Sequence, residues 1–343
     1  MHVKKISFVA VATCALMALM AGATPLPTLN IDAAQTSVSG ASSGGYMAVQ
    51  LHVAYSSSFK KGVGVVAGGP FNCAENSVLN AIGRCLGYAP IPVDELVATT
   101  NKWAREGWID APSQMETSKV YLFSSASDTV VKQETTFALQ AFYQNYVPAT
   151  GIVHKQDIVT EHAFVTDNYG AVCLTKASPF INNCGFDLAG ALLQHLYGPL
   201  TISKSGALES GLIEFDQTPF ATGHGMGASG WIYVPKTCAA GGQCRLHVAL
   251  HGCKQNSTDV GQEFVRNAGY NRWAENNNMV ILYPQTGKGA TNSCWDWWGY
   301  NSANYAKKSA PQMAAIMTMV EHLARGTAPL PRAPVVGPTP AKR

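Results

Sequence analysis

One serine of this chain lies in a setting that suits a nucleophile. Ser42 is the centre of Gly40-Ala41-Ser42-Ser43-Gly44, which has the form G-x-S-x-G, and the short run 36–39 precedes it. In this pattern a strand ends in a sharp turn that exposes the serine hydroxyl, and a helix follows. The glycines permit the strained turn and the close approach of neighbouring backbone. The pattern is common by chance in a chain rich in Gly and Ser, so its surroundings must decide its meaning.

A nucleophilic serine needs a base that takes its proton and an acid that orients the base. Asp128 follows an expected strand at 119–123, and His162 follows the next expected strand, 152–159. Ligands of parallel sheets lie beyond the carboxyl ends of the strands, where both side chains would then be. Ser42, Asp128 and His162 are therefore the predicted catalytic residues. The rival acids are Asp157, Asp167 and Asp187.

Acyl transfer also requires backbone N–H groups that stabilise the developing oxyanion. The N–H of Ser43, directly after the nucleophile, is one such donor. The second usually belongs to a loop with an H-G-x pattern, and His251-Gly252-Cys253 follows the expected strand 246–250. We therefore expect the oxyanion hole to consist of the N–H groups of Ser43 and Cys253.

Strands and helices are expected to alternate along the chain. Apolar patterning predicts strands at 62–67, 119–123, 152–159, 230–235, 246–250 and 279–283, helices at 45–55, 93–106, 135–146, 187–197 and 313–324, and a cysteine-stapled loop at 71–92. Such alternation predicts an α/β fold in which helices cover both faces of a mostly parallel sheet.

The position of the serine is unusual because almost no strand precedes it. In an α/β-hydrolase several strands come before the serine turn, whereas here the strands from 230 to 283 come after His162. The same fold would result if the old chain ends were joined and new ends opened just before Ser42. Ends that lie close together on a surface make this rearrangement tolerable. The predicted fold class is therefore a circularly permuted α/β-hydrolase.

The first 23 residues have the features of a secretory signal peptide. A basic start, Lys4-Lys5, precedes the apolar stretch 6–20 and an A-x-A cleavage site at 21–23. A membrane-spanning or buried helix is the alternative, but the stretch is short for a span. We expect residues 24–326 to form a single catalytic domain and the Pro-rich tail 327–343 to be disordered. The predicted location is extracellular, with the periplasm as the alternative.

Removal of the signal peptide, which contains one of the nine cysteines, leaves an even number suited to disulfides in an oxidising compartment. Spacing alone does not fix the pairing. No C-x-x-C or H-x-x-x-H pattern accompanies the cysteines, so we expect neither a metal nor another cofactor. The pairs that the spacing suggests are Cys73 with Cys85, Cys173 with Cys184, Cys238 with Cys244, and Cys253 with Cys294.

Charge and composition exclude some partners. The chain has 24 Lys and Arg against 21 Asp and Glu, with no basic run, so we expect no nucleic-acid partner. No segment after the signal peptide is long and apolar enough to cross a membrane. We also expect the protein to be a monomer. The aromatic run 293–298 has two interpretations: Trp295 or Trp297 contacts substrate in the cleft, or the rings pack around a disulfide.

Two longer stretches resemble extracellular poly(3-hydroxybutyrate) depolymerases, in the form with a circularly permuted (type 2) catalytic domain. They are Gly40 to Met47, GASSGGYM, and Trp231 to Gln255, which includes CRLHVALHGCKQ. The resemblance spans nearly the whole mature chain. It implies hydrolysis of a short-chain polyester or its oligomers without a metal, with Ser42, Asp128, His162 and the Cys253 loop in the roles above.

Many members of that family carry an additional polymer-binding domain, for which this chain has only the short tail. Attack on amorphous polymer or soluble oligomers is therefore favoured over attack on crystalline polymer. The alternatives are an esterase for feruloyl or acetyl groups on polysaccharides, a serine peptidase, and a non-catalytic polymer-binding protein.

Overall fold

The computed structural model describes residues 24–221 and 223–327, so the expected signal peptide and all but the first residue of the expected tail lie outside the described residues. A nine-stranded sheet has the order β1-β9-β10-β12-β11-β2-β3-β4-β5, and a small sheet has the order β6-β8-β7. The strands are β1 Thr24–Pro25, β2 Ile31–Ala41, β3 Gly62–Val66, β4 Lys119–Phe123, β5 Ile152–Lys155, β6 Phe164–Thr166, β7 Ala171–Val172, β8 Ile181–Asn183, β9 Leu212–Asp216, β10 Ser229–Tyr233, β11 Cys244–Leu250 and β12 Met279–Tyr283.

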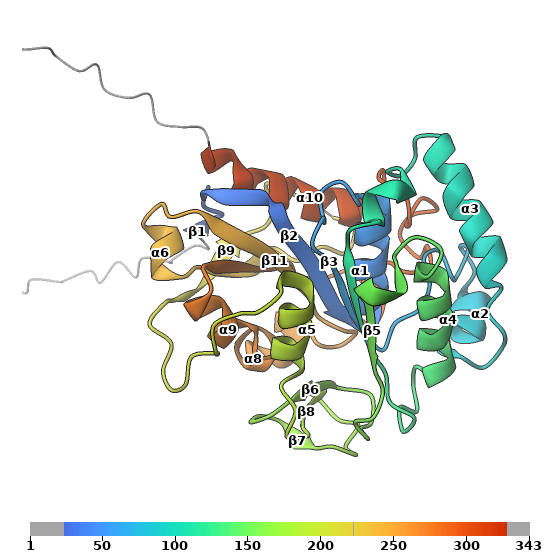
Figure 1. Cartoon of the computed structure of the whole chain (residues 1–343), viewed down its shortest axis with the longest axis horizontal. Helices are drawn as coiled ribbons and strands as arrows, with labels where there is room; N and C mark the ends of the chain where they lie inside the picture. The colour runs from blue at the N-terminus through green and yellow to red at the C-terminus, as the bar shows by residue number, and fades with distance from the viewer. Residues whose placement is uncertain (1–23, 222, 328–343) are drawn as a thin grey trace, which may run out of the picture.

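The six neighbouring strands from β12 to β5 are parallel, whereas β10 is antiparallel to β9 and β12. The helices are α1 Ser43–Ala54, α2 Val78–Ile82, α3 Val93–Arg105, α4 Gln133–Tyr143, α5 Leu188–Tyr197, α6 Lys236–Ala239, α7 Ser257–Val260, α8 Glu263–Asn267, α9 Tyr270–Asn276 and α10 Pro311–Ala324, with 3₁₀ turns η1 Arg84–Leu86, η2 Pro112–Met115, η3 Ala149–Gly151, η4 Thr291–Ser293 and η5 Arg325–Thr327. The mostly parallel sheet with helices confirms the α/β class (Figure 1).

Two hydrophobic clusters lie on the two faces of the large sheet. Successive residues of a strand point to opposite faces, and in β4 Val120 and Leu122 belong to one cluster while Tyr121 and Phe123 belong to the other. In Figure 1, α10 covers one face of the sheet and α5, α8 and α9 cover the other. Both faces are thus buried, which explains why β3, β4 and β12 are almost entirely apolar.

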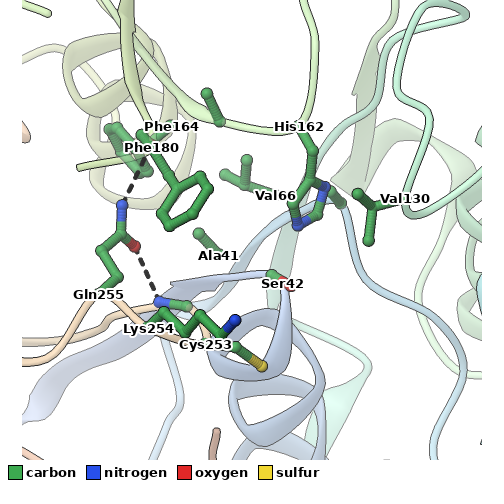
Figure 2. A pocket seen from close by; sticks show the side chains of 13 residues that line it. Ala41, Ser42, Val66, Val130, His162, Phe164, Phe180, Cys253, Lys254 and Gln255 are labelled. Carbon is green, nitrogen blue, oxygen red and sulfur yellow. Dashed lines mark hydrogen bonds between the residues drawn. The ribbon is translucent and has the colours of Figure 1, made fainter. Parts of the chain in front are cut away.

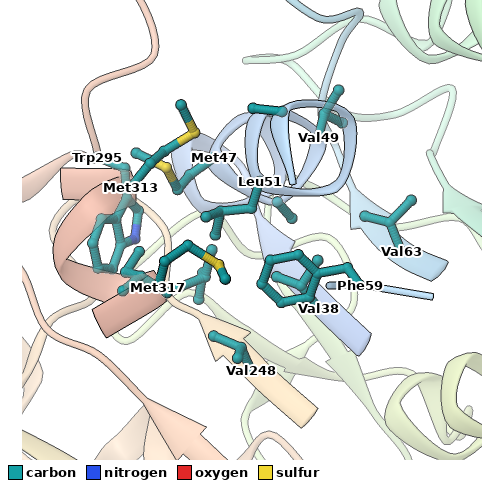
Figure 3. Packing of buried hydrophobic residues seen from close by; sticks show 14 of the residues in the cluster. Val38, Met47, Val49, Leu51, Phe59, Val63, Val248, Trp295, Met313 and Met317 are labelled. Carbon is teal, nitrogen blue, oxygen red and sulfur yellow. The ribbon is translucent and has the colours of Figure 1, made fainter. Parts of the chain in front are cut away.

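The first cluster fixes the helix that follows the serine. Figure 3 shows Met47 of α1 beside Met313 and Met317 of α10, close to Val38 of β2 and Val248 of β11. All five side chains are buried. Burial of a side chain of this size stabilises the fold by about 1.5–3 kcal/mol, so α1 and its first residue are firmly placed against the sheet.

The order of strands agrees with the expected circular permutation. Strand β2 is central, and those strands of the large sheet that follow His162 in sequence, β9 to β12, all lie on its β11 side. The new ends are adjacent: the N–H of Leu29 donates to the carbonyl of Leu323 at 2.8 Å, and His322 Nε2 lies 2.8 Å from the carbonyl of Leu26. When a chain is joined at its old ends and cut elsewhere, the two new ends lie side by side, as these do.

Some local expectations differ from the structure. The segment 71–92 contains α2 and η1 rather than only loop, and β5 ends at Lys155 instead of Val159. The small sheet β6-β8-β7 was not expected, because strands of two or three residues carry too little periodicity to be recognised. Among residues 24–221 and 223–327, no helix has the length and apolarity needed to cross a membrane.

The cysteine pairing agrees with the spacing argument. Each of the eight cysteines after the leader forms a disulfide, and the pairs are Cys73–Cys85, Cys173–Cys184, Cys238–Cys244 and Cys253–Cys294. Three bonds close short local loops, whereas the fourth joins segments 41 residues apart and anchors the loop after β11.

Candidate active site

Ser42 lies on a strained turn between β2 and α1. Its φ of 54° and ψ of −121° place it in the left-handed half of backbone space, which a serine rarely adopts. Its N–H donates to the carbonyl of Val66 at 2.8 Å. A Cβ on Gly40 would lie 2.2 Å from the carbonyl oxygen of Gly44, so only glycine fits there. These features are those of a serine turn in an α/β-hydrolase.

Asp128 and His162 lie in the loops after β4 and β5 and contact each other. Asp128 Oδ2 is 2.7 Å from His162 Nδ1, and its Oδ1 accepts the N–H groups of Val130 at 2.8 Å and Val131 at 2.9 Å. The carboxylate is buried. Since a carboxylate only accepts, His162 Nδ1 is the donor, and in the neutral imidazole Nε2 is then the acceptor. The pair therefore has the orientation required of a general base.

The rival acids have other partners. Asp157 is an exposed residue paired with Lys155. Asp167 and Asp187 both pair with Arg272, and Asp187 also caps α5 by accepting the N–H of Gly190. Among the described residues, Asp128 alone of the four forms a hydrogen bond with His162.

Ser42 and His162 line one cavity of about 300 Å³. In Figure 2, His162 lies on one side of Ser42, and Cys253 and Lys254 lie on the other. No hydrogen bond joins Ser42 to His162 in the described part of the chain; in free enzymes this bond often tightens only when substrate binds. The remaining wall is mostly apolar, formed by Ala41, Val66, Ala67, Val130, Ala163, Phe164 and Phe180, with Gly252 and Gln255 completing it.

Two backbone N–H groups next to Ser42 have no acceptor among the described residues. Ser43 is the first residue of α1, so its N–H has no intrahelical partner. The N–H of Cys253 likewise donates to no protein oxygen. Its neighbour Gly252 is close to the nucleophile, because a Cβ there would lie 3.4 Å from Ser42 Cβ. The two groups that the sequence pointed to are thus both available for an oxyanion.

Gln255 holds the loop after β11 in place. Its Oε1 accepts the N–H of Gly252 at 2.8 Å, and its Nε2 donates to the carbonyls of Pro179 and Phe180 at 2.9 and 3.1 Å. The side chain is buried. Because Gly252 N–H is occupied by Gln255, the next N–H along the loop, that of Cys253, is the one left free. Gln255 also links this loop to Phe180 of the cavity wall (Figure 2).

His251 and Trp295 support the same loop from the core. Burial lowers the pKa of His251 to about 4, so its ring is neutral. The Thr286 N–H donates to His251 Nε2 at 3.2 Å, which leaves Nδ1–H to donate to the carbonyl of Gly252 at 2.7 Å. Trp295 Nε1 donates to the carbonyl of His251 at 3.0 Å. These hydrogen bonds hold His251 and Gly252 in place and so fix the direction of the backbone at Cys253.

The two tryptophans suggested as substrate contacts, Trp295 and Trp297, lie in the core. Trp295 is fully buried, and Trp297 is buried and stacked on Tyr46 with ring centroids 4.3 Å apart. Neither lines the cavity that contains Ser42. Their burial and the disulfide of Cys294 favour the interpretation in which the aromatic rings pack around a disulfide.

Glu161 is a residue of the site that sequence reasoning missed. Its carboxylate accepts the N–H of His162 at 2.9 Å and the N–H and hydroxyl of Thr129 at 3.2 and 2.8 Å. It thereby ties the Asp128 loop to the His162 loop. Burial raises its pKa, but the hydrogen bonds from His162 and Thr129 outweigh this and hold the pKa below its usual value. Its position next to His162 was the only sequence signal.

Comparisons with known proteins agree with the geometry. The family model described as "Esterase PHB depolymerase" matches residues 229–326. A poly(3-hydroxybutyrate) depolymerase of Delftia acidovorans is 59% identical over 320 residues, which are 92% of this chain and 65% of that protein. This chain therefore spans just under two thirds of that relative's length. A polyhydroxybutyrate depolymerase of Talaromyces funiculosus is 38% identical over 331 residues, 91% of this chain and 96% of that protein.

Solved structures show the same fold. The crystal structure of the PHB depolymerase from Penicillium funiculosum matches with a TM-score of 0.84 and 38% identity, over 88% of this chain and 99% of that one. A serine-to-alanine variant of a PHB depolymerase in complex with an R3HB trimer matches with a TM-score of 0.84 and 37% identity, over 88% and 99% of the two chains. This chain belongs to the poly(3-hydroxybutyrate) depolymerase family.

Proposed function

We propose that the protein is a secreted serine esterase that hydrolyses poly(3-hydroxybutyrate) or its oligomers to 3-hydroxybutyrate units. The observation that carries the proposal is the shared cavity in which Ser42, on its strained turn, faces a His162 oriented by Asp128. Membership of the depolymerase family supports the choice of substrate, and the solved relative with an R3HB trimer supports an oligomer as a ligand of this fold.

In the proposed mechanism, His162 Nε2 takes the proton of Ser42 Oγ as this oxygen attacks the ester carbonyl. The oxyanion that forms accepts hydrogen bonds from the N–H groups of Ser43 and Cys253. Collapse of the tetrahedral intermediate breaks the ester bond, and His162 gives its proton to the departing alcohol. Water, deprotonated by His162, then attacks the acyl group on Ser42 and releases the hydroxyacid. Asp128 stabilises the imidazolium in both steps.

The cavity wall suits a polyester with short apolar branches. The side chains of Val66, Val130, Phe164 and Phe180 offer apolar contact for methyl groups, and no residue of this wall other than Lys254 carries a permanent charge. A peptide would bring backbone N–H groups that require acceptors, and this apolar wall has few to offer. The ester of a methyl-branched hydroxyacid is therefore the better match.

Export is part of the proposal. Four disulfides join the eight cysteines after residue 23, and such bonds persist in oxidising compartments outside the cytoplasm. The N-terminal pattern of a basic start, an apolar stretch and an A-x-A site suits a cleaved leader.

The test is hydrolysis of amorphous poly(3-hydroxybutyrate) granules by the purified protein and by its Ser42→Ala variant. We expect the parent to release 3-hydroxybutyrate and its oligomers, measured by chromatography, and the variant to be slower by about 10⁴–10⁶-fold. Feruloylated and acetylated polysaccharides serve as comparison substrates. Release of ferulate or acetate, but of no hydroxyacid, by the parent would overturn the choice of substrate.

A further inference from the structure

Lys254 is the one permanently charged side chain among the residues that line the cavity. It follows Cys253 directly and lies on the opposite side of Ser42 from His162 in Figure 2. The other polar side chain of this part of the wall, Gln255, has its amide oxygen and nitrogen engaged with Gly252, Pro179 and Phe180. Apart from Ser42 and His162, an incoming ligand therefore meets apolar side chains and the ammonium of Lys254.

The ammonium of Lys254 has no carboxylate partner among the described residues. The ion pairs found in residues 24–221 and 223–327 do not include it. Lys254 thus keeps its charge unpaired beside an apolar cavity, which leaves it free for an anionic ligand.

The backbone at Lys254 is held in a defined place. Its φ is 53°, a conformation that needs support from its surroundings, and its N–H donates to the carbonyl of Asn292 at 3.0 Å. The preceding residue is fixed by the Cys253–Cys294 disulfide. Lys254 is an exposed residue, so its side chain can move to a ligand without disturbing the core.

We propose that Lys254 binds the terminal carboxylate of short 3-hydroxyacid oligomers and makes the enzyme prefer oligomers with a free acid end over neutral esters. This inference rests on the proposed function. Every such oligomer ends in one carboxylate, and each hydrolysis step produces another. Methyl branches would contact the apolar wall while the carboxylate meets the ammonium, a charge-assisted contact near a low-dielectric surface.

The test compares the 3-hydroxybutyrate trimer with its methyl ester, which differs only in the terminal charge. The kcat and KM values of the parent, Lys254→Met and Lys254→Arg are measured for both substrates at low ionic strength. The matched control is Lys60→Met, because Lys60 is exposed and precedes β3 at the end of the sheet remote from the cavity. Thermal unfolding of each variant verifies that it is folded.

For the parent we expect kcat/KM to be about five-fold higher for the acid than for the methyl ester, mainly through KM, with the difference reduced by about 0.5 M salt. Lys254→Met should bring the ratio close to one, while Lys254→Arg and Lys60→Met should keep it. A ratio that is the same in the parent and Lys254→Met refutes the inference alone. A Lys254→Arg variant whose ratio falls as far as that of Lys254→Met refutes it as well. A parent that hydrolyses granules but neither trimer also refutes this inference alone. A parent that hydrolyses neither the trimers nor the granules overturns the proposed function and this inference with it.

Discussion

The Asp128→Asn variant tests the assigned orientation of His162 directly. In the parent, Asp128 Oδ2 accepts the proton of His162 Nδ1 at 2.7 Å, and Oδ1 accepts the backbone N–H groups of Val130 and Val131. Asparagine can keep the two backbone bonds with its carbonyl oxygen. Its NH₂ group, however, would then face Nδ1 as a donor, so Nδ1 must become an acceptor and the proton moves to Nε2. The imidazole then presents a proton to Ser42 instead of a lone pair.

The structure supports a large loss of rate with a small loss of stability. A general base in the wrong tautomer lowers kcat by about 10⁴-fold, which is about 5.5 kcal/mol of transition-state stabilisation. Since both backbone hydrogen bonds remain, we expect the free energy of unfolding to fall by only about 1 kcal/mol.

The assay is hydrolysis of a soluble butyrate ester with a chromogenic leaving group, together with urea unfolding followed by circular dichroism. Asp157→Asn is the matched control, because Asp157 has the same chemistry in the loop after β5 but is exposed and paired only with Lys155. Its kcat should stay within about two-fold of the parent. A kcat of Asp128→Asn within about ten-fold of the parent, in a folded protein, would refute the orientation argument.

Three further predictions concern the loop that carries Cys253 and the buried histidines. Gln255→Ala should lower kcat about 10- to 100-fold with a smaller change in KM, because the Gly252 N–H loses its acceptor and the loop loses its link to Phe180. A kcat of this variant equal to that of the parent in steady-state assays would contradict the prediction. Replacing Cys253 and Cys294 together by serine should lower the free energy of unfolding by about 4 kcal/mol, since the bond closes a loop with a separation of 41 residues, and urea titration of both proteins measures the difference. Burial lowers the pKa of His52 and His247 to about 3 and that of His251 to about 4, so below the unfolded value of about 6.5 the unfolded chain binds protons that the folded one does not. Stability should therefore fall as the pH falls from about 6.5 towards 4, by up to about 1.4 kcal/mol per pH unit for each histidine, and urea midpoints that are equal at pH 7.5 and pH 5 would contradict this.

The parts of the fold that the sequence predicted are those with strong local patterns. β3, β4, β11 and β12 are buried on both faces, so their continuous apolar runs mark them without any tertiary information. The serine turn could be recognised because its strained backbone and close packing demand Gly40 and Gly44 at fixed positions. By contrast, β6 and β7 have only three and two residues, too few to show a strand period, and form only by pairing with β8.

In the candidate site, too, the residues that could be predicted are those marked by local sequence patterns. Residues that lie just beyond strand ends, such as Asp128 and His162, could be placed from the order of the elements. Trp295 could not, because whether an aromatic ring faces a cavity or the core depends on the path of loop 284–310, which no periodicity reveals. Glu161 and Gln255 act through hydrogen bonds between loops, and such contacts are visible only once the loops have been brought together.

Labelling with a fluorophosphonate shows directly whether Ser42 is the nucleophile for polyester hydrolysis. The protein is titrated with the reagent, the labelled peptide is identified by mass spectrometry, and hydrolysis of poly(3-hydroxybutyrate) granules is measured on the same samples. We expect one label per chain, on the peptide that contains Ser42, and a loss of granule hydrolysis in proportion to the labelled fraction. Label on a different serine, or granule hydrolysis that persists when Ser42 is fully modified, would contradict it.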